Sequence, residues 1–387
     1  MSLCDRTRRS KVSKPLMSEG GGRGAEVGLP TLFLYRKLRP IKQNAPQGCA
    51  ARGEEIYCCA IRSRAENALC AFFFIRKSKE QGAHILIQKE NHMDRVRKII
   101  NAGYAHEKGY YGEEIGIAVL DTGIYPHPDF GHRIACFQDY VRGRISPYDD
   151  NGHGTHIAGI IGGDGGVSGG IYMGLAPRCH FIIMKILDHK GNGNTEHVVQ
   201  AIDWLVQYRK AYQVRIVNIS IGMVLHAKSR ERARLLQAVE YAWDNDMAVV
   251  AAAGNNGPGE NSITVPGICR KIITVGCFDD TREQIGRAPL KPYYSGQGPT
   301  DHCIVKPELV LPGTNVTSCA PYPVMYTQKS GTSMAAPMVS GAVALLLSKY
   351  PQFSPADVKL RLYQRKVDLG LPLSKQGWGM VDIGKLL

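Results

Sequence analysis

The sequence predicts an α/β protein of three layers, with helices on both faces of a mostly parallel central sheet. Between residues 115 and 364, short apolar runs of strand length alternate with longer runs of helix length. This alternation is typical of parallel sheets with crossover helices. The strand-length runs are apolar throughout instead of alternating with polar residues, which indicates strands that are buried on both faces.

The alternation predicts five strands and five helices. The expected strands lie at 115–120, 181–186, 214–219, 248–253 and 272–276, and the expected helices at 153–161, 195–212, 230–245, 333–349 and 355–364. In sheets of this kind, ligands bind beyond the carboxyl ends of the strands. We therefore expect functional side chains directly after the apolar runs.

The first 92 residues differ from the rest in composition. The 387-residue chain has a net charge of +14, and residues 1–92 hold 17 Lys and Arg against 8 Asp and Glu. Residues 1–60 lack any sustained period of 2 or 3.6, which predicts disorder. The apolar runs at 71–75 and 84–87 are compatible with a helix or a strand pair. We expect a basic, largely disordered extension over residues 1–92 and one folded domain over 93–387, which begins with an amphipathic helix at Met93.

Composition also bears on partners and compartment. A nucleic-acid site is normally a basic face on a folded domain, so we do not expect nucleic acid as a partner. The alternative is that the basic residues 1–92 form a module that binds nucleic acid or another acidic surface. The eleven cysteines include no C-x-x-C pair, so a zinc site is not expected. Their odd number favours reduced thiols in the cytoplasm. We find neither a stretch of about 20 apolar residues nor a signal peptide, and expect no membrane partner.

Asp121 and His153 lie where the predicted fold would place functional side chains. Asp121 follows the first expected strand, and a buried carboxylate needs a partner. His153 stands between two glycines at the start of an expected helix, and histidine is the natural general base near neutral pH. Taken singly, they could be a turn-forming aspartate and a structural histidine. We expect the nearby His156 to be structural.

Ser333 and Asn255 complete the set. Ser333 directly precedes a long apolar run, so we expect it at a helix N-terminus, where free N–H groups and the helix dipole favour negative charge. Asn255 follows the expected strand 248–253 and could donate its amide to an oxyanion. Taken singly, these residues could be a helix cap and an Asn-containing turn. It is the ordered set that favours catalysis.

The order Asp-Thr-Gly, His-Gly-Thr-His, Gly-Asn, Gly-Thr-Ser-Met-Ala-Ala-Pro resembles the subtilisin-like serine proteases (peptidase S8) from about Ile115 to Trp378. The resemblance implies a subtilisin-like α/β/α fold and a serine endopeptidase that forms an acyl-enzyme. Ser333 would be the nucleophile, His153 the general base and acid, and Asp121 the residue that orients it. Asn255 and the Ser333 N–H would form the oxyanion hole.

Two other classes of protein are alternatives to a subtilisin-like protease. A lipase or esterase of the α/β-hydrolase class would require Gly-x-Ser-x-Gly and the order Ser, Asp, His, which this chain does not have. A catalytically silent pseudoprotease, acting as a peptide-binding regulator or scaffold, is the alternative to an enzyme. Residues 1–92 resemble neither a signal peptide nor the folded prodomain of secreted family members, which favours an intracellular enzyme.

The resemblance also implies a cleft for protein or peptide substrates bound as an extended strand. Small or neutral residues in the implied pocket lead us to expect broad cleavage, with an apolar preference before the scissile bond. The implied substrate-binding residues are Ser220, Ile221, Gly222, Gly191, Asn192, Gly193, Ala252, Gly254, Asn256 and Thr264, of which Thr264 would narrow the pocket.

No cofactor is expected for the chemistry, and the case for a structural metal is weak. Family members often bind calcium through the loop after the histidine helix, together with an aspartate that corresponds to Asp129. Here the loop 162–170 contains a single carboxylate, Asp164, whereas calcium takes six to eight oxygen ligands. We therefore expect the familiar calcium site to be altered or absent. The sequence does not indicate an oligomeric state.

Overall fold

A computed structural model of the chain describes residues 93–221, 229–279, 294–300 and 305–387, together with three strands nearer the N-terminus. Those strands, β1 (Glu55–Arg62), β2 (Leu69–Lys77) and β3 (His84–Ile85), form an antiparallel sheet in that order. The chain divides into two compact units, Met1–Lys89 and Glu90–Leu387. The disorder expected over residues 1–60 is wrong for residues 55–60, which belong to β1, and residues 1–54 lie outside the described residues.

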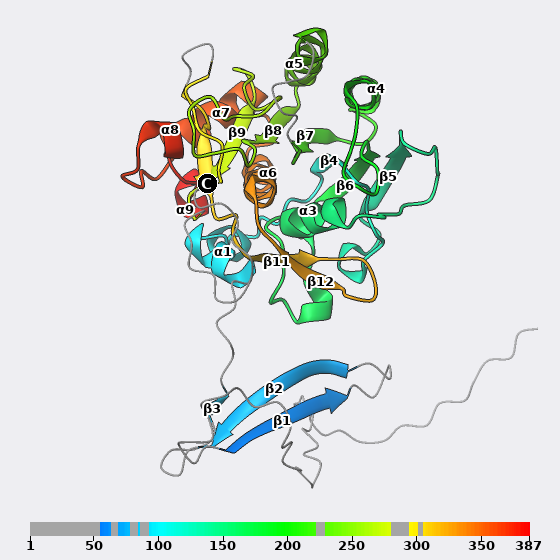
Figure 1. The fold of residues 1–387 in the computed structure, drawn as a ribbon, viewed down its shortest axis with the longest axis vertical. Coiled ribbons are helices and arrows are strands. Elements are labelled where there is room, and N and C mark those ends of the chain that lie inside the picture. Colours follow the sequence, from blue (N-terminus) through cyan, green and yellow to red (C-terminus); the bar gives the residue numbers. More distant parts are fainter. Residues whose placement is uncertain are drawn as a thin grey trace, which may run out of the picture. The chain divides into compact units, whose positions relative to one another are not determined.

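The second unit is built on a seven-stranded sheet in the order β10-β9-β8-β7-β4-β6-β5 (Figure 1). Every neighbouring pair is parallel. From β4 the chain forms β5 and β6 on one side, with β6 between β4 and β5, and then crosses to form β7 to β10 on the other side. Such a change of direction creates a crevice at the carboxyl ends of the central strands. The strands are β4 (Gly116–Asp121), β5 (Ile134–Asp139), β6 (His180–Lys185), β7 (Val214–Ile219), β8 (Ala248–Ala252), β9 (Ile273–Cys277) and β10 (Leu309–Leu311).

Helices cover both faces of this sheet, as expected. Ile117 and Val119 of β4 belong to one hydrophobic core with α3 (His153–Gly162) and α6 (Thr332–Lys349). The alternate residues Ala118 and Leu120 belong to a second core with α4 (Thr195–Tyr208) and α5 (Ser229–Asp244). Because side chains alternate between faces, this double burial explains why the strands are mostly apolar. The other helices are α1 (Met93–Ile99), α2 (Gly103–Glu107), α7 (Pro355–Gln364), α8 (Leu373–Gln376) and α9 (Ile383–Leu386).

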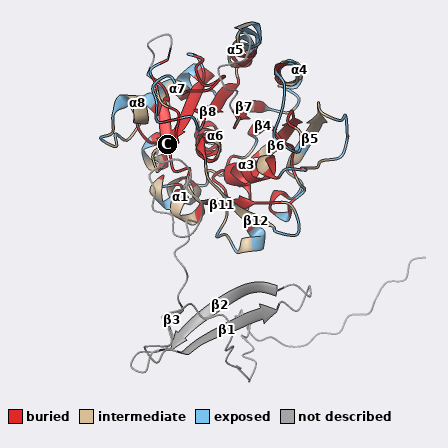
Figure 2. Cartoon of the chain, viewed as in Figure 1, coloured by how far each residue is buried: buried red, intermediate tan, exposed pale blue. Residues whose placement is uncertain are grey.

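Helix α6 lies at the centre of the first core. Among the described residues it is the one helix long and apolar enough to cross a membrane, and 83% of that 18-residue window is buried inside the protein. Figure 2 shows the helix as a buried element. Its apolar surface is therefore accounted for by packing against the sheet and α3.

A short antiparallel hairpin precedes α6 in the chain. Its strands are β11 (Val316–Cys319) and β12 (Tyr326–Lys329), and β11 contacts α3. The sequence analysis did not anticipate this hairpin. Five cysteines of the second unit are free thiols: Cys136, Cys179, Cys269, Cys277 and Cys319.

Candidate active site

Asp121 and His153 form a hydrogen-bonded pair at the carboxyl edge of the sheet. Asp121 is the last residue of β4 and is fully buried, whereas His153 is the first residue of α3 and its side chain is 22% exposed. The Oδ1 atom of Asp121 lies 2.8 Å from Nδ1 of His153 and also accepts the Thr122 N–H at 2.7 Å. The pair occupies Nδ1 and leaves Nε2 as the nitrogen that can exchange a proton.

The surroundings of His153 favour its charged form. Burial lowers the pKa of His153, but the charge and the hydrogen bond of Asp121 outweigh burial and raise the pKa above the usual 6.5. Lys329 acts against this rise and Asp149 supports it. A raised pKa makes His153 a stronger base, but it must be neutral to accept a proton.

Gly154 allows α3 to approach β4 closely enough for this pair to form. A Cβ atom at Gly154 would lie 2.1 Å from the carbonyl oxygen of Gly123 and 3.2 Å from Cβ of Asp121. Real Cβ atoms do not approach backbone this closely, so the start of the helix can meet the strand end only with glycine there. This close approach gives a structural reason for the Gly-His-Gly sequence.

Asp149 joins the turn after β4 to the start of α3 by further hydrogen bonds. Its buried carboxylate accepts hydrogen bonds from Oγ1 of Thr122 at 2.9 Å, the Gly152 N–H at 2.7 Å and Oγ1 of Thr155 at 2.6 Å. Burial raises the pKa of Asp149, but these hydrogen bonds outweigh burial and lower the pKa overall. Asp149 is not among the residues predicted from the sequence, because it lies four residues before the start of α3 and outside the N-cap position, which Gly152 occupies.

Ser333 lies at the N-terminus of α6, as expected. It is the second residue of the helix, so its backbone N–H has no acceptor within the helix. Its hydroxyl donates to the backbone carbonyl of Ser220 at 2.7 Å. Ser220 directly follows β7, and α6 therefore brings Ser333 to the carboxyl edge of the sheet that Asp121 also occupies. Without substrate, catalytic hydrogen bonds are often not yet formed.

Asn255 presents its amide NH₂ group beside the same helix start. Its Oδ1 atom accepts from the N–H of Thr332 at 3.0 Å and from Oγ1 of Thr332 at 3.1 Å. Since a backbone N–H can only donate, the amide oxygen must face Thr332, and Nδ2 remains as the donor. A Cβ at Gly331, whose φ is +150°, would lie 3.2 Å from that Nδ2. The exposed Asn255 can thus donate beside the start of α6, where Ser333 also presents its N–H.

Some of the implied substrate-binding residues lie around this edge. Ser220 is buried, Ile221 is half-buried, Asn256 is exposed, and Gly222 lies outside the described residues. Thr264 is buried against Gly254, where an added Cβ would lie 2.4 Å from its Cγ2 atom. Thr264 therefore fills the space beside Gly254, and Ala252 is buried as the last residue of β8.

Gly191, Asn192 and Gly193 form an exposed turn. Oδ1 of Asp188 accepts the Asn192 N–H at 2.9 Å, and Gly193 forms an isolated bridge with Leu187. The turn thus has a defined backbone, without being a strand itself.

His156 serves the fold. It is fully buried, and its Nε2 atom lies 3.1 Å from the carbonyl oxygens of both Val316 and Thr327. Burial lowers its pKa to about 3, so the ring stays neutral. Its hydrogen bonds join α3 to the β11–β12 hairpin, in agreement with the structural role expected for it.

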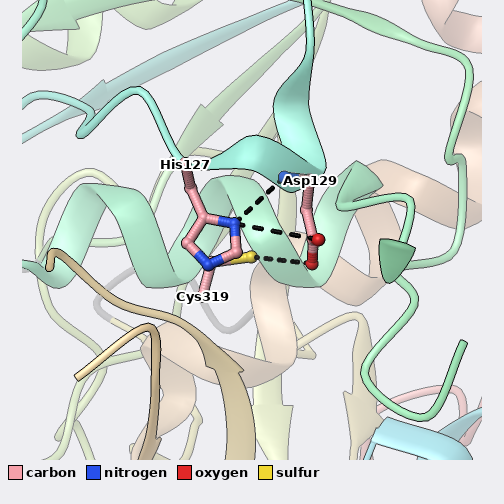
Figure 3. Close-up of side chains that lie close together, drawn as sticks. All are labelled: His127, Asp129 and Cys319. Carbon is pink, nitrogen blue, oxygen red and sulfur yellow. Dashed lines mark hydrogen bonds and ion pairs between the residues drawn. The ribbon is translucent and has the colours of Figure 1, made fainter. Parts of the chain in front are cut away.

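A second cluster of polar side chains is made by His127, Asp129 and Cys319 (Figure 3). All three are buried, and one ligand atom from each lies within 4.8 Å of the others. Oδ1 of Asp129 accepts the Val167 N–H at 3.0 Å, and Oδ2 accepts from the Tyr326 hydroxyl at 2.6 Å and the Cys319 thiol at 3.7 Å. Asp129 also donates its own N–H to Nδ1 of His127 at 3.1 Å.

The protons in this cluster follow from its hydrogen bonds. Nδ1 of His127 accepts an N–H, so in the neutral ring the proton is on Nε2. Burial lowers the pKa of His127 and raises that of Cys319 well above its usual range, which keeps the imidazole and the thiol neutral. A metal would require the thiolate and a nitrogen lone pair. Here the thiol keeps its proton and the Nδ1 lone pair already accepts the Asp129 N–H.

Comparison with known proteins agrees with this fold. Residues 112–379 match the Subtilase family, Peptidase S8. Serine protease AprX of Bacillus subtilis (strain 168) is 37% identical over 266 residues, which are 64% of this chain and 60% of AprX. Subtilisin DY of Bacillus licheniformis is 33% identical over 275 residues, 70% of this chain and 90% of that protein. The matched region thus spans less than two thirds of AprX and most of subtilisin DY.

Solved structures give the same result. Sphericase aligns with a TM-score of 0.59 and 28% identity, covering 71% of this chain and 96% of that chain. A cold-adapted subtilisin-like serine proteinase aligns with a TM-score of 0.56 and 28% identity, covering 70% and 88%. A parallel α/β sheet that carries Asp, His and Ser at its carboxyl edge defines a class of serine hydrolases. This chain belongs to the Subtilase family, and the subtilisin-like fold predicted from the sequence is confirmed.

Proposed function

We propose that the protein is a serine endopeptidase that cleaves peptide bonds with Ser333 as nucleophile. The observation that carries this proposal is the 2.8 Å hydrogen bond between Asp121 and Nδ1 of His153. It occurs at the edge of the sheet where α6 presents Ser333. Membership of the Subtilase family, whose named relatives here are serine proteases, supports the same activity.

In the proposed mechanism, the Ser333 hydroxyl turns from the Ser220 carbonyl to Nε2 of His153 and gives up its proton as Oγ attacks the substrate carbonyl. The resulting oxyanion accepts hydrogen bonds from the Ser333 N–H and the Asn255 amide. His153 then returns the proton to the leaving amine. Water repeats the sequence on the acyl-enzyme, while buried Asp121 holds the tautomer of His153.

The same proposal includes broad specificity with an apolar preference. The side chain before the scissile bond would enter the space beside Gly254, which Thr264 limits. Thr264→Ser removes the Cγ2 methyl and should raise kcat/KM for peptides with aromatic residues relative to those with small apolar ones. Thr264→Val keeps the volume and should leave this ratio unchanged. If Thr264→Ser leaves the ratio as it is, Thr264 does not limit the pocket.

The alternative is a catalytically silent pseudoprotease, and one observation favours it. The Ser333 hydroxyl is engaged by Ser220, instead of by His153. Labelling of the full chain with a fluorophosphonate, peptide mapping and a casein-cleavage assay separate the two functions, with Ser333→Ala as the control. Label at Ser333 together with cleavage establishes the protease. Folded protein that neither labels nor cleaves establishes the alternative.

We further propose that hydrogen bonds replace a cation at the position of the family's calcium site. Both oxygens of Asp129 accept hydrogen bonds, one of them from Val167 in the loop after α3. A cation would face the hydrogens of those donors, and His127 and Cys319 are not ligands that calcium prefers. We expect the melting temperature to be the same in calcium and in chelator. A calcium-dependent increase that Asp129→Asn abolishes would contradict this proposal.

A further inference from the structure

The described residues include two fully buried lysines, Lys185 and Lys306. Lys185 is the last residue of β6, and its register partner on β4 is Asp121. An ammonium group removed from water is costly unless it has charged or hydrogen-bonding partners. The position of Lys185 next to the proposed active site therefore calls for an explanation.

All three donors of the Lys185 ammonium are used. Nζ donates to the carbonyl oxygen of Thr122 at 2.5 Å, to Oδ1 of Asp150 at 2.8 Å and to the carbonyl oxygen of Leu187 at 2.9 Å. It also lies 4.8 Å from the ring centroid of Tyr148. The three acceptors come from the turn after β4, the loop before α3 and the turn after β6, so a single atom joins three segments.

Two of these segments carry the proposed catalytic pair. Thr122 follows Asp121, and its N–H donates to the carboxylate oxygen that also binds His153. Asp150 lies three residues before His153. Lys185 therefore binds the backbone carbonyl of Thr122, while the backbone N–H of Thr122 donates to Asp121 and orients its carboxylate. Movement of Thr122 would move the Asp121 carboxylate relative to His153.

We propose that Lys185 is a positioning residue that fixes the Asp121–His153 pair by joining the turn after β4 to the loop before α3. The proposal rests on the proposed function for its catalytic consequence. Methionine at position 185 would have a similar length and fill the same space, but it would donate to none of the three acceptors. Since Asp150 also lies 3.7 Å from Arg142, it keeps an ion partner when Lys185 is replaced.

The test is Lys185→Met in the full chain, compared with Lys306→Met. We expect Lys185→Met to lower kcat about tenfold to a hundredfold, because small misplacements of catalytic groups have effects of this size. KM should stay within about twofold, since the cleft itself is unchanged. The proton NMR resonance of His153 Nδ1–H should shift or broaden. Lys306→Met removes an equally buried lysine whose partners are Ile272, Thr274 and Glu308, and should leave kcat and the resonance unchanged.

Asp150→Asn is the second variant, to be used if Lys185→Met does not fold. It removes the negative charge from one of the three acceptors and should change kcat and the resonance in the same direction, but less. The proposal is overturned if the folded variant keeps both the wild-type kcat per active site and the wild-type resonance. A wild-type protein without peptidase activity would contradict the proposed function instead. The resonance would still test the positioning role, because it requires no turnover.

Discussion

Asn255 has one face of its amide fixed and the other free, because Thr332 binds the amide oxygen. Its NH₂ group becomes useful only as the substrate carbonyl gains negative charge, so its loss should affect the transition state more than the bound substrate. A hydrogen bond to a charged group contributes about 1.5–3 kcal/mol. Asn255→Ala should therefore lower kcat by about 10- to 150-fold, with KM nearly unchanged.

Steady-state kinetics on a peptide substrate measure this effect, with the concentration of active sites set by titration. Asn245→Ala is the control, because it removes an amide that donates to the Tyr241 carbonyl at the end of α5. It should not change kcat. An Asn255→Ala variant that raises KM at constant kcat would place Asn255 in substrate binding and not in the oxyanion hole.

The charges around His153 predict how activity depends on pH. His153 must be neutral to act as a base, and Asp121 raises its pKa against the effect of burial. Activity should therefore fall as the pH decreases through this raised pKa. In Asp121→Asn the burial remains and the charge is lost, so the acidic limb of kcat/KM should move to lower pH. The value of kcat/KM on the plateau above this limb should fall by as much as general-base catalysis contributes, about 10²–10⁴-fold.

Lys329→Met should have the opposite effect on the same limb. The charge of Lys329 lowers the pKa of His153, so its removal should move the acidic limb to higher pH. The pH dependence of kcat/KM for the two variants and the wild type measures both shifts in one experiment. Shifts in the same direction would show that these charges do not govern the titration of His153.

At the scale of the element, the start of α3 leaves no room for a side chain at Gly154. A Cβ at Gly154 would collide with the Gly123 carbonyl and press on Asp121. Gly154→Ala should therefore push α3 away from β4, destabilise the protein by about 1–3 kcal/mol and strongly reduce labelling of Ser333. Gly103→Ala is the matched control, because an added Cβ there meets nothing within 4 Å.

Thermal unfolding measures the loss of stability, and the rate of fluorophosphonate labelling measures the effect on Ser333. Gly103→Ala should retain both the melting temperature and the labelling rate. If Gly154→Ala also retains both, the close approach of α3 to β4 is not needed for the arrangement of the site.

The central elements could be predicted because their sequence patterns are local and strong. β7 and α7 have the bounds that the apolar runs predict, and β4 and β6 differ from them by one residue. β5 was missed because it is an edge strand whose residues are mostly half-buried, which gives a mixed apolar and polar pattern. The β11–β12 hairpin was missed because each strand has four residues and pairs only with the other.

The candidate site shows the same division between local and distant information. Asp121, His153, Ser333 and Asn255 could be singled out because each follows a strand or begins a helix, and parallel topology brings such positions to one edge. Lys185 could not be singled out, since its three acceptors lie in turns and a loop, two of them at least 35 positions away. The resting hydrogen bond from Ser333 to Ser220 spans 113 positions and also depends on the completed fold.

At the scale of the whole molecule, a buried lysine at each end of the sheet joins neighbouring segments by hydrogen bonds. Lys185 lies at the carboxyl ends of the strands, next to the proposed catalytic pair. Lys306 lies near the start of β9, where it donates to the Ile272 carbonyl, Oγ1 of Thr274 and Glu308. Lys359 of α7 shares Glu308 at 2.9 Å. This second cluster joins the C-terminal helices to the sheet and should therefore influence global stability.

The pKa of Lys306 predicts a dependence of that stability on pH. Burial lowers the pKa of Lys306 from 10.5 to about 8, although Glu308 opposes the change. Because the folded pKa lies below the unfolded one, the stability linked to this group is fully present above pH 10.5 and is lost as the pH falls to about 8. The wild type should therefore gain stability relative to Lys306→Met as the pH rises through this window, by on the order of 3 kcal/mol.

Denaturant unfolding between pH 8 and 10.5 measures this difference, with both proteins carrying Ser333→Ala to prevent self-digestion. Methionine fills much the same volume, and Glu308 retains its ion pair with Lys359 in the variant. Other lysines and tyrosines titrate in both proteins, so their contributions cancel in the difference between the two free energies of unfolding. If that difference is constant across the window, Lys306 has a similar pKa in the folded and unfolded chain, and its burial is compensated by Glu308 and the two oxygen acceptors.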